Sequence, residues 1–233
     1  MQFDIALSIG DMCQTRKHLT IELRRRFGYD AGGGSFFFDW TSRDQGLVGV
    51  SRAIAEGFEF RREDFSVRRV GARLKAYNSR YGLYFTHDLK FEAKEPGPDA
   101  DIQLEAGYAA LAAKYLHIGQ KTRDVLASNK RVLFLVCGAV TQEEAECFAG
   151  VLQNVDFKVL HLPFANKQQA GVQHPSFMIS PIHFELWPGH AQSWAAALAP
   201  IELPEIRNFD AWLGRRSHQA LPFHHLAAPA GQA

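Results

Sequence analysis

The chain has few cysteines, little net charge and no long apolar segment. Its three cysteines, Cys13, Cys137 and Cys147, are too few and too far apart for a disulfide framework, which favours a reducing compartment. The 26 basic and 25 acidic residues leave a net charge of +1, so composition gives no electrostatic reason to expect nucleic acid or an anionic membrane as a partner. No apolar run approaches the ~20 residues that span a bilayer. The first residues carry an acid and no basic residue, unlike a signal peptide, and we therefore expect a cytoplasmic protein.

Hydrophobic residues, and phenylalanine in particular, are plentiful. The chain is 46% hydrophobic and 233 residues long, enough to bury the core of one large domain. Its 18 phenylalanines are roughly twice the usual number, since ordinary usage is about 4%. This excess favours an aromatic core or an apolar pocket.

A strand followed directly by a helix is predicted at the N-terminus. Residues 3–9 (FDIALSI) form a short apolar run closed by Gly10, which is typical of a buried strand. Residues 14–27 then carry apolar side chains at helical spacing, and Asp11 can accept from the free N–H groups of the first turn. Cys13 falls at the turn between the two elements.

Periodicity and turn signals predict further elements along the chain, whereas residues 61–69 are charged and ambiguous. In chain order these are a helix at 43–58, a β-hairpin at 70–91, an amphipathic helix at about 104–125, strands at 132–137 and 157–162 with a capped helix at 141–152 between them, an edge strand within 176–187, and helices at 192–198 and 206–213. Within the hairpin, strand alternation places His87 on the inward face with Phe85 and Leu89, and Asp88 on the opposite face.

These elements predict an α/β fold, with a mainly parallel three-layer sheet, an inserted antiparallel hairpin and a C-terminal extension. We expect a core domain over 1–165, with the hairpin insert at about 67–92. Residues 166–225 are expected to pack on this core, and 226–233 to form a flexible tail.

Cys13 is the first candidate for chemistry. At a helix N-terminus the backbone N–H groups stabilise a thiolate, which lowers the pKa of the thiol and strengthens it as a nucleophile. The end of a strand is also where α/β sheets place their sites. The competing interpretation is a cysteine that only packs in the core.

His87 and two aspartates could assist such a thiol. Partly buried beside a thiolate, His87 would suit a general base; otherwise it is a core histidine bonded to a backbone carbonyl. Asp39 stands among four aromatic residues (FFFDW) and needs a partner if buried, so it either orients His87 or caps the next helix. Asp88 could serve only at a strand end or a bulge.

Three short motifs together resemble a known family. Ser8-Ile9-Gly10 before Cys13, then Phe38-Asp39-Trp40, then residues 84–88 (YFTHD) resemble an uncharacterised bacterial family labelled as papain-like cysteine peptidases, over about residues 3–165. The resemblance implies that Cys13 is the nucleophile and His87 the base. A glutamine shortly before the cysteine and the Cys-Gly-Ser-Cys-Trp signature, both typical of papain-type enzymes, are absent.

Other motifs give weaker signals. Three glycines at 32–34 are not followed by Lys-Ser/Thr, so they are not a phosphate-binding loop. His183, Glu185 and His190 could bind a metal, but the first two alternate with apolar residues and more simply form a solvated strand face. We therefore expect no metal and no cofactor.

The sequence thus favours a cysteine-dependent hydrolase or acyl-transfer enzyme. Cys13 would attack a carbonyl, His87 would accept and return the proton, and Asp39 or Asp88 would orient the imidazole. Backbone N–H groups at Cys13 and Gln14 would stabilise the oxyanion. The residues expected to contact a small-molecule or peptide substrate are Gln14, Arg16, Phe38 and Trp40. The alternative is a non-hydrolytic nucleotide- or sugar-binding protein, or a transferase.

Overall fold

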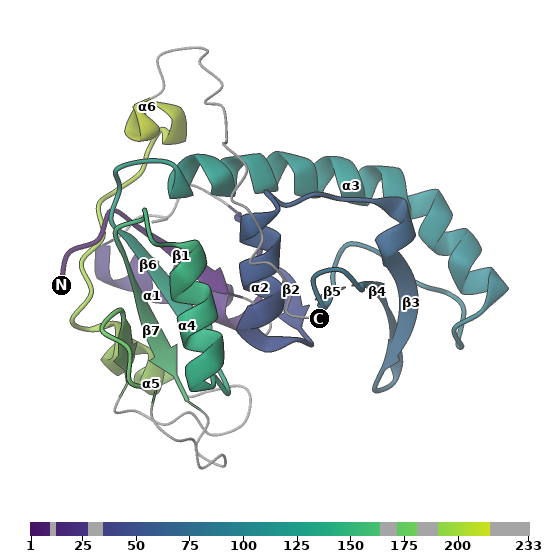
Figure 1. Ribbon diagram of the computed structural model, residues 1–233, viewed down its shortest axis with the longest axis horizontal. Coiled ribbons are helices and arrows are strands. Elements are labelled where there is room, and N and C mark those ends of the chain that lie inside the picture. The colour runs from purple at the N-terminus through teal and green to yellow at the C-terminus, as the bar shows by residue number, and fades with distance from the viewer. Residues whose placement is uncertain (10–12, 28–34, 164–171, 181–190, 215–233) are drawn as a thin grey trace, which may run out of the picture.

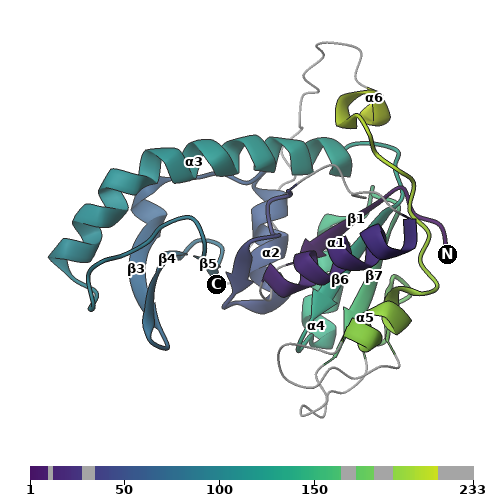
Figure 2. The same cartoon turned by 180° about the vertical axis from the view of Figure 1, so that it is seen from behind.

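Two four-stranded sheets organise the computed structural model, which describes residues 1–9, 13–27, 35–163, 172–180 and 191–214 (Figures 1 and 2). The described strands are β1 (Ile5–Ile9), β2 (Thr41–Arg43), β3 (Phe65–Val70), β4 (Arg73–Asn78), β5 (Leu83–Phe85), β6 (Val132–Cys137), β7 (Phe157–Leu162) and β8 (Phe177–Ile179). The described helices are α1 (Cys13–Phe27), α2 (Gly46–Ala55), α3 (Pro98–Leu126), α4 (Gln142–Val151), α5 (Ala191–Leu198) and α6 (Phe209–Leu213), with a 3-10 turn at Arg62–Asp64. The predicted α/β class is confirmed, and the predicted tail lies outside the described residues.

The first sheet is parallel, with strand order β1-β6-β7-β8. Its central strand β6 is the unbroken apolar run that the sequence marks as a core strand. Val132, Phe134 and Val136 face one side, and Leu133 and Leu135 face the other. A parallel strand needs apolar residues at every position because both of its faces are covered.

Helices cover both faces of this sheet. On one face α1 and α5 pack together through Leu19, Leu23 and Leu198 (Figure 2). On the other face lies α4, whose Phe148 contacts Phe134 of β6 with ring centroids 5.2 Å apart (Figure 1). The result is the three-layer arrangement predicted from the alternation of strands and helices.

The second sheet is antiparallel, with strand order β2-β5-β4-β3, and is larger than the predicted hairpin. The predicted hairpin is present as β4 and β5, joined by a turn in which Asn78 Oδ1 accepts from the backbone N–H of Tyr81 at 2.9 Å. The ambiguous residues 61–69 supply most of β3. The helix predicted from residue 43 begins only at Gly46, because residues 41–43 form β2.

The second strand of the hairpin is much shorter than the expected 81–91. β5 pairs with β2 over Leu83–Phe85, and the pairing stops at Phe85 opposite Thr41. The chain before Thr41 turns away, and the Thr41 N–H donates to the Phe38 carbonyl oxygen at 3.3 Å. Beyond Phe85, Asp88 is bonded to α3, so the chain follows that helix instead of continuing the sheet. This shortening changes the orientation predicted for His87.

The long helix α3 crosses over the antiparallel sheet and leads into the parallel one (Figure 1). Its Tyr115 lies at the centre of an aromatic cluster, with ring centroids 5.4, 5.5 and 4.7 Å from those of Phe37, Phe60 and Phe85. Many of the phenylalanines are thus buried in the core. Although α3 has 29 residues, none of the described helices is apolar enough along its length to cross a bilayer.

One carboxylate caps two helices. Glu144 completes the predicted capping box of α4, because Thr141 Oγ1 accepts from the Glu144 N–H at 3.1 Å and Glu144 Oε2 accepts from the Thr141 N–H at 2.8 Å. Its other oxygen, Oε1, accepts from the N–H of Leu47 in the first turn of α2 at 3.0 Å. The N-cap residue of α2, Gln45, has no capping side-chain bond of its own, so Glu144 links both helices.

Replacing this carboxylate should weaken both helix starts. We expect Glu144→Ala to lower the free energy of unfolding by about 2 kcal/mol, because two backbone N–H groups lose their acceptor. Urea unfolding followed by circular dichroism would measure it. The exposed Glu143 in the same helical turn gives a control, Glu143→Ala, expected to cost less than about 0.5 kcal/mol. Equal costs for the two variants would contradict the double cap.

His18 helps to join α1 to α5 and couples this contact to pH. Its ring is stacked on Trp194, with centroids 5.0 Å apart and an interplanar angle of 8°. Burial, and secondarily the nearby Lys17, lower the pKa of His18 below 6.5. Folding therefore favours the neutral imidazole, whereas the unfolded chain binds the proton more readily.

Stability should consequently fall as the pH decreases below about 6.5, towards the lower pKa that His18 has in the folded chain. We expect His18→Phe, which preserves a stacking ring without a titratable nitrogen, to show a smaller loss of unfolding free energy between pH 7.5 and pH 5 than the wild type. Urea titrations at several pH values would measure this. Identical pH profiles for the two proteins would show that His18 does not contribute.

Candidate functional site

The carboxyl ends of β1 and β6 meet the antiparallel sheet. β1 ends at Ile9 and β6 at Cys137, whose carbonyl oxygen accepts from Arg43 Nη2 of β2 at 2.8 Å. Ser8, next to the end of β1, donates to Asp39 Oδ1 at 2.6 Å. Open α/β sheets bind their ligands at this edge. The contact between the two sheets is therefore the candidate site.

Helix α1 begins at Cys13, at this same edge and beside β2 (Figure 2). Residues 10–12 and the side chains of Cys13 and Gln14 lie outside the described residues, so the structure describes the helix start and not the thiol. The first turn contains no acidic residue. No carboxylate there opposes the partial positive charge of the helix N-terminus.

The rest of the first turn is fixed to both sheets. Thr15 Oγ1 donates to Cys137 Sγ at 3.3 Å, which ties the helix to the end of β6. Arg16 Nε lies 3.5 Å from Asp39 Oδ2, with side-chain exposures of 8% and 0% for the two residues. Arg16 was expected to contact substrate; the structure gives most of its side chain an internal role as the counter-ion of Asp39.

Asp39 is the fully buried carboxylate of the site, and it has the partners that the sequence required. Its Oδ1 accepts from Ser8 Oγ and its Oδ2 from the backbone N–H of Phe36 at 2.7 Å, besides the ion pair with Arg16. Burial raises its pKa, while Arg16 and the hydrogen bonds from Ser8 and Phe36 act in the opposite direction. Asp39 thus joins β1, α1 and the turn before β2 around one charge.

The two aromatic residues beside Asp39 have different positions. Phe38 is 2% exposed and contacts Phe37 and Phe58, so it belongs to the core and the prediction that it contacts substrate is wrong. Trp40 is half-buried and donates from Nε1 to Ser35 Oγ at 3.0 Å. Side chains in sequence around a tight turn point to different sides, which separates these neighbours.

His87 is exposed, and the expectation that it points inward with Phe85 is wrong. The strand ends at Phe85, so the alternation that would bury His87 stops two residues before it. Its imidazole contacts Trp40 edge to face, with ring centroids 5.9 Å apart and an interplanar angle of 83°. The histidine expected as a base therefore lies beside the tryptophan that follows Asp39.

Asp88 is turned towards α3. Tyr115 Oη donates to Asp88 Oδ2 at 2.9 Å, and Lys114 forms an ion pair with Oδ1. Burial, with Asp88 as the next cause, raises the pKa of Tyr115. Within the described residues the partners of Asp88 and Asp39 are thus other groups, and neither carboxylate is bonded to His87. The predicted role of Asp39 or Asp88 in orienting the imidazole is not seen in this structure.

Lys121 of α3 is a site residue that the sequence did not reveal. Its Nζ lies 4.6 Å from the ring centre of Phe36 and 4.5 Å from that of Phe209. Burial and then Arg16 lower its pKa, whereas Asp39 raises it. A lysine within an amphipathic helix normally indicates a solvated face, and only its helical spacing between buried positions could have indicated otherwise.

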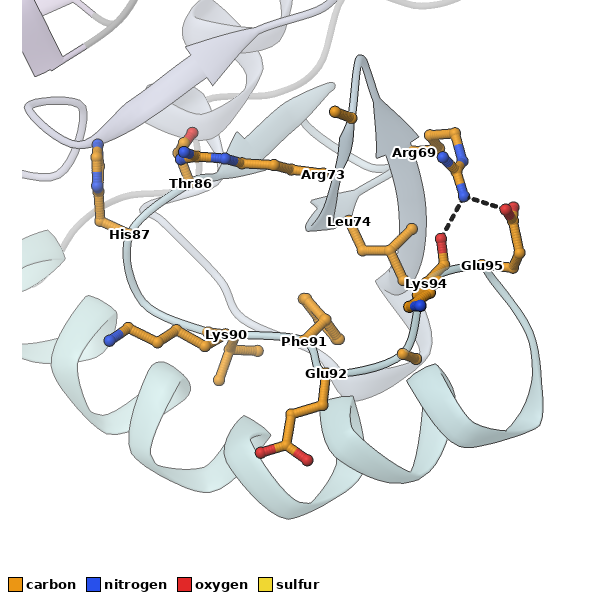
Figure 3. Close-up of a pocket in the computed structure, with 13 residues that line it drawn as sticks. Arg69, Arg73, Leu74, Thr86, His87, Lys90, Phe91, Glu92, Lys94 and Glu95 are labelled. Atoms are coloured by element: carbon orange, nitrogen blue, oxygen red, sulfur yellow. Dashed lines mark hydrogen bonds and ion pairs between the residues drawn. The ribbon is translucent and has the colours of Figure 1, made fainter.

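A cavity of about 790 Å³ opens at His87, between the β3–β4 hairpin and the chain that follows β5 (Figure 3). Thr86 and His87 lie at one end, and Arg69 with its ion-pair partner Glu95 at the other. The sequence did not predict this cavity, because it lies where the expected strand would have filled the space beside β4.

The described residues contain no group of three or more His, Cys, Asp or Glu side chains placed to hold a metal ion. His183, Glu185 and His190 lie outside the described residues. Cys137 is buried in β6, as its apolar strand predicts, and Cys147 is exposed on α4.

Because Asp39 is buried and charged, the contact between the two sheets should be sensitive to its substitution. Asp39→Ala would leave Arg16 without its buried counter-ion and remove the acceptor of Ser8 and Phe36. We expect it to lower the free energy of unfolding by about 3 kcal/mol. Urea unfolding would measure this. Asp156→Ala serves as control, since Asp156 is 66% exposed and 3.8 Å from Arg131, and it should cost less than about 0.5 kcal/mol. An Asp39→Ala protein as stable as this control would contradict the assigned role.

Comparisons with known proteins found no relative of this chain. No protein-family model matches the chain, no curated protein matches it, and no solved structure matches it. The features of the chain that bear on its function are therefore the start of α1 at Cys13, the buried Asp39, and the exposed His87 beside Trp40.

Proposed function

We propose that the protein is a cysteine-dependent hydrolase or acyl-transfer enzyme, with Cys13 as the nucleophile and His87 as the general base. One observation carries the proposal: a short series of contacts connects the helix that starts at Cys13 to His87. Arg16, in the first turn of that helix, pairs with Asp39, and the next residue, Trp40, contacts the imidazole. These contacts thus connect residues that are far apart in the sequence.

The start of α1 supports Cys13 as the nucleophile. The free N–H groups of a first helical turn favour a thiolate over a thiol, and the first turn of α1 contains no acidic residue that would oppose this effect. The same backbone N–H groups, at Cys13 and Gln14, would stabilise an oxyanion. Buried Asp39 would keep the turn in place through Arg16.

The position of His87 supports a role in proton transfer. An exposed imidazole can contact a substrate and exchange protons with water, which a core histidine cannot do. The edge-to-face contact with Trp40, which is itself bonded to Ser35, restricts the ring. Trp40 would therefore act as the positioning residue of the imidazole, in place of an aspartate.

The proposed reaction balances with these groups alone. The Cys13 thiolate forms a bond to the acyl carbon, and the bond to the leaving group breaks as His87, protonated by the thiol, gives its proton to that group. Water, or the hydroxyl or amine of an acceptor, then attacks the thioester. His87 takes the proton of this second nucleophile, and the thiolate is released.

The pH dependence of Cys13 alkylation tests the proposal. We expect iodoacetamide to modify Cys13 as a thiolate that titrates well below the ordinary thiol pKa of about 8.5. In His87→Ala this pKa should rise, because the imidazolium that stabilises the thiolate is lost. Mass spectrometry of the modified peptides gives the rate at each pH.

The chain provides its own controls for this experiment. Cys147 is exposed on α4, and its alkylation in the same sample gives the reference profile. His117, exposed on α3, gives a matched variant, His117→Ala, that should leave the Cys13 profile unchanged. A Cys13 that reacts like Cys147, with no response to His87→Ala, would overturn the proposal and favour the non-hydrolytic binding protein instead.

A further inference from the structure

The cavity beside His87 has an apolar floor. It is lined by Leu74 of β4 and by Leu89 and Phe91 from the chain that follows β5. All three side chains are half-buried against the main core. Its volume of about 790 Å³ lies within the range of roughly 300–1,000 Å³ that small-molecule sites occupy. The floor can therefore receive the apolar part of a ligand.

The rim of the same cavity is positively charged. Four basic and two acidic side chains line it, which leaves two net positive charges. Arg69 is already bonded to Glu95 and to the Lys94 carbonyl oxygen. The remaining acid, Glu92, points away from the hollow in Figure 3. The excess charge thus comes from side chains such as Arg73 that have no acidic partner on the rim.

Arg73 is the basic residue best placed to contact a ligand. It is exposed at the start of β4, and Figure 3 shows its side chain extended along the cavity towards Thr86, at the end where His87 lies. A guanidinium offers a planar pair of donors that suits a carboxylate or a phosphate. A ligand bound by Arg73 would have its other groups within the cavity and next to the imidazole.

We propose that this cavity is a binding site for an amphipathic anion, with a carboxylate or phosphate held by Arg73 and an apolar body on Leu74 and Phe91. The inference that this anion is the acyl substrate rests on the proposed function of His87. The binding itself does not, since it depends on the floor and the rim alone. The favoured substrates would then be acyl compounds that carry a negative charge.

Two dyes of similar shape separate the charge from the apolar surface. Anilinonaphthalene sulfonate is an apolar anion, and phenylnaphthylamine has the same rings without the sulfonate. We expect the wild type to bind the anion more tightly than the neutral dye, and Arg73→Gln to weaken binding of the anion about tenfold while leaving the neutral dye unchanged. Fluorescence titration measures both. The control is Arg207→Gln. Arg207 does not line the cavity and its side chain is 83% exposed, so this variant should bind both dyes as the wild type does.

Competition with octanoate and octyl phosphate identifies the head group, because the better competitor displaces the dye at the lower concentration. Equal affinity for the two dyes, no effect of Arg73→Gln, or no displacement by either competitor would overturn the proposed site.

A separate assay keeps this site distinct from the proposed chemistry. The wild type should hydrolyse the nitrophenyl half-ester of suberate, whose carboxylate is too distant to attack its own ester, faster than nitrophenyl octanoate, and Arg73→Gln should remove most of this preference. Anion binding that requires Arg73, together with hydrolysis unaffected by Cys13→Ser, would retain the site and refute the enzyme. Hydrolysis that requires Cys13, without a preference for the charged ester, would retain the enzyme and refute the cavity as its substrate site.

Discussion

The buried charge of Asp39 is the constraint on which the arrangement of the molecule depends. A carboxylate without access to water needs hydrogen bonds and a counter-ion, and here each comes from a different element. Ser8 supplies one from the end of β1, Arg16 supplies the charge from α1, and the Phe36 backbone closes the turn before β2. Asp39 therefore joins the parallel and antiparallel sheets, together with the bond from Arg43 of β2 to the Cys137 carbonyl oxygen of β6.

This joint determines what lies at the carboxyl edge of the parallel sheet. With Arg16 fixed to Asp39 and Thr15 to Cys137, the first turn of α1 has contacts with both sheets. Trp40 directly follows Asp39 and contacts His87, although the two residues stand 27 and 74 positions after Cys13 in the sequence. Contacts through Arg16, Asp39 and Trp40 thus link the helix of the proposed nucleophile to the proposed base.

Particular residues show why some sequence predictions were confirmed and others were wrong. The apolar run at 132–137 became a central strand, and the Thr141–Glu144 capping box started a helix, because both signals depend on neighbours in the chain. The predicted orientation of His87 was wrong because side-chain alternation holds only while the strand continues. Whether it continues depends on its partners: β2 begins only at Thr41, so it offers no partner beyond Phe85, and Asp88 is bonded to α3.

The sequence by itself determined the α/β class, the order of the main elements, the position of Cys13 at a helix start, and the need of Asp39 for partners. Local periodicity, capping and the cost of burying a charge are properties that a single segment carries. Only the tertiary structure decided that Arg16 is the counter-ion of Asp39, that Asp88 bonds to α3, and that a basic cavity opens beside His87. Those outcomes depend on contacts between residues distant in the chain, and the spacing of residues along one segment does not contain that information.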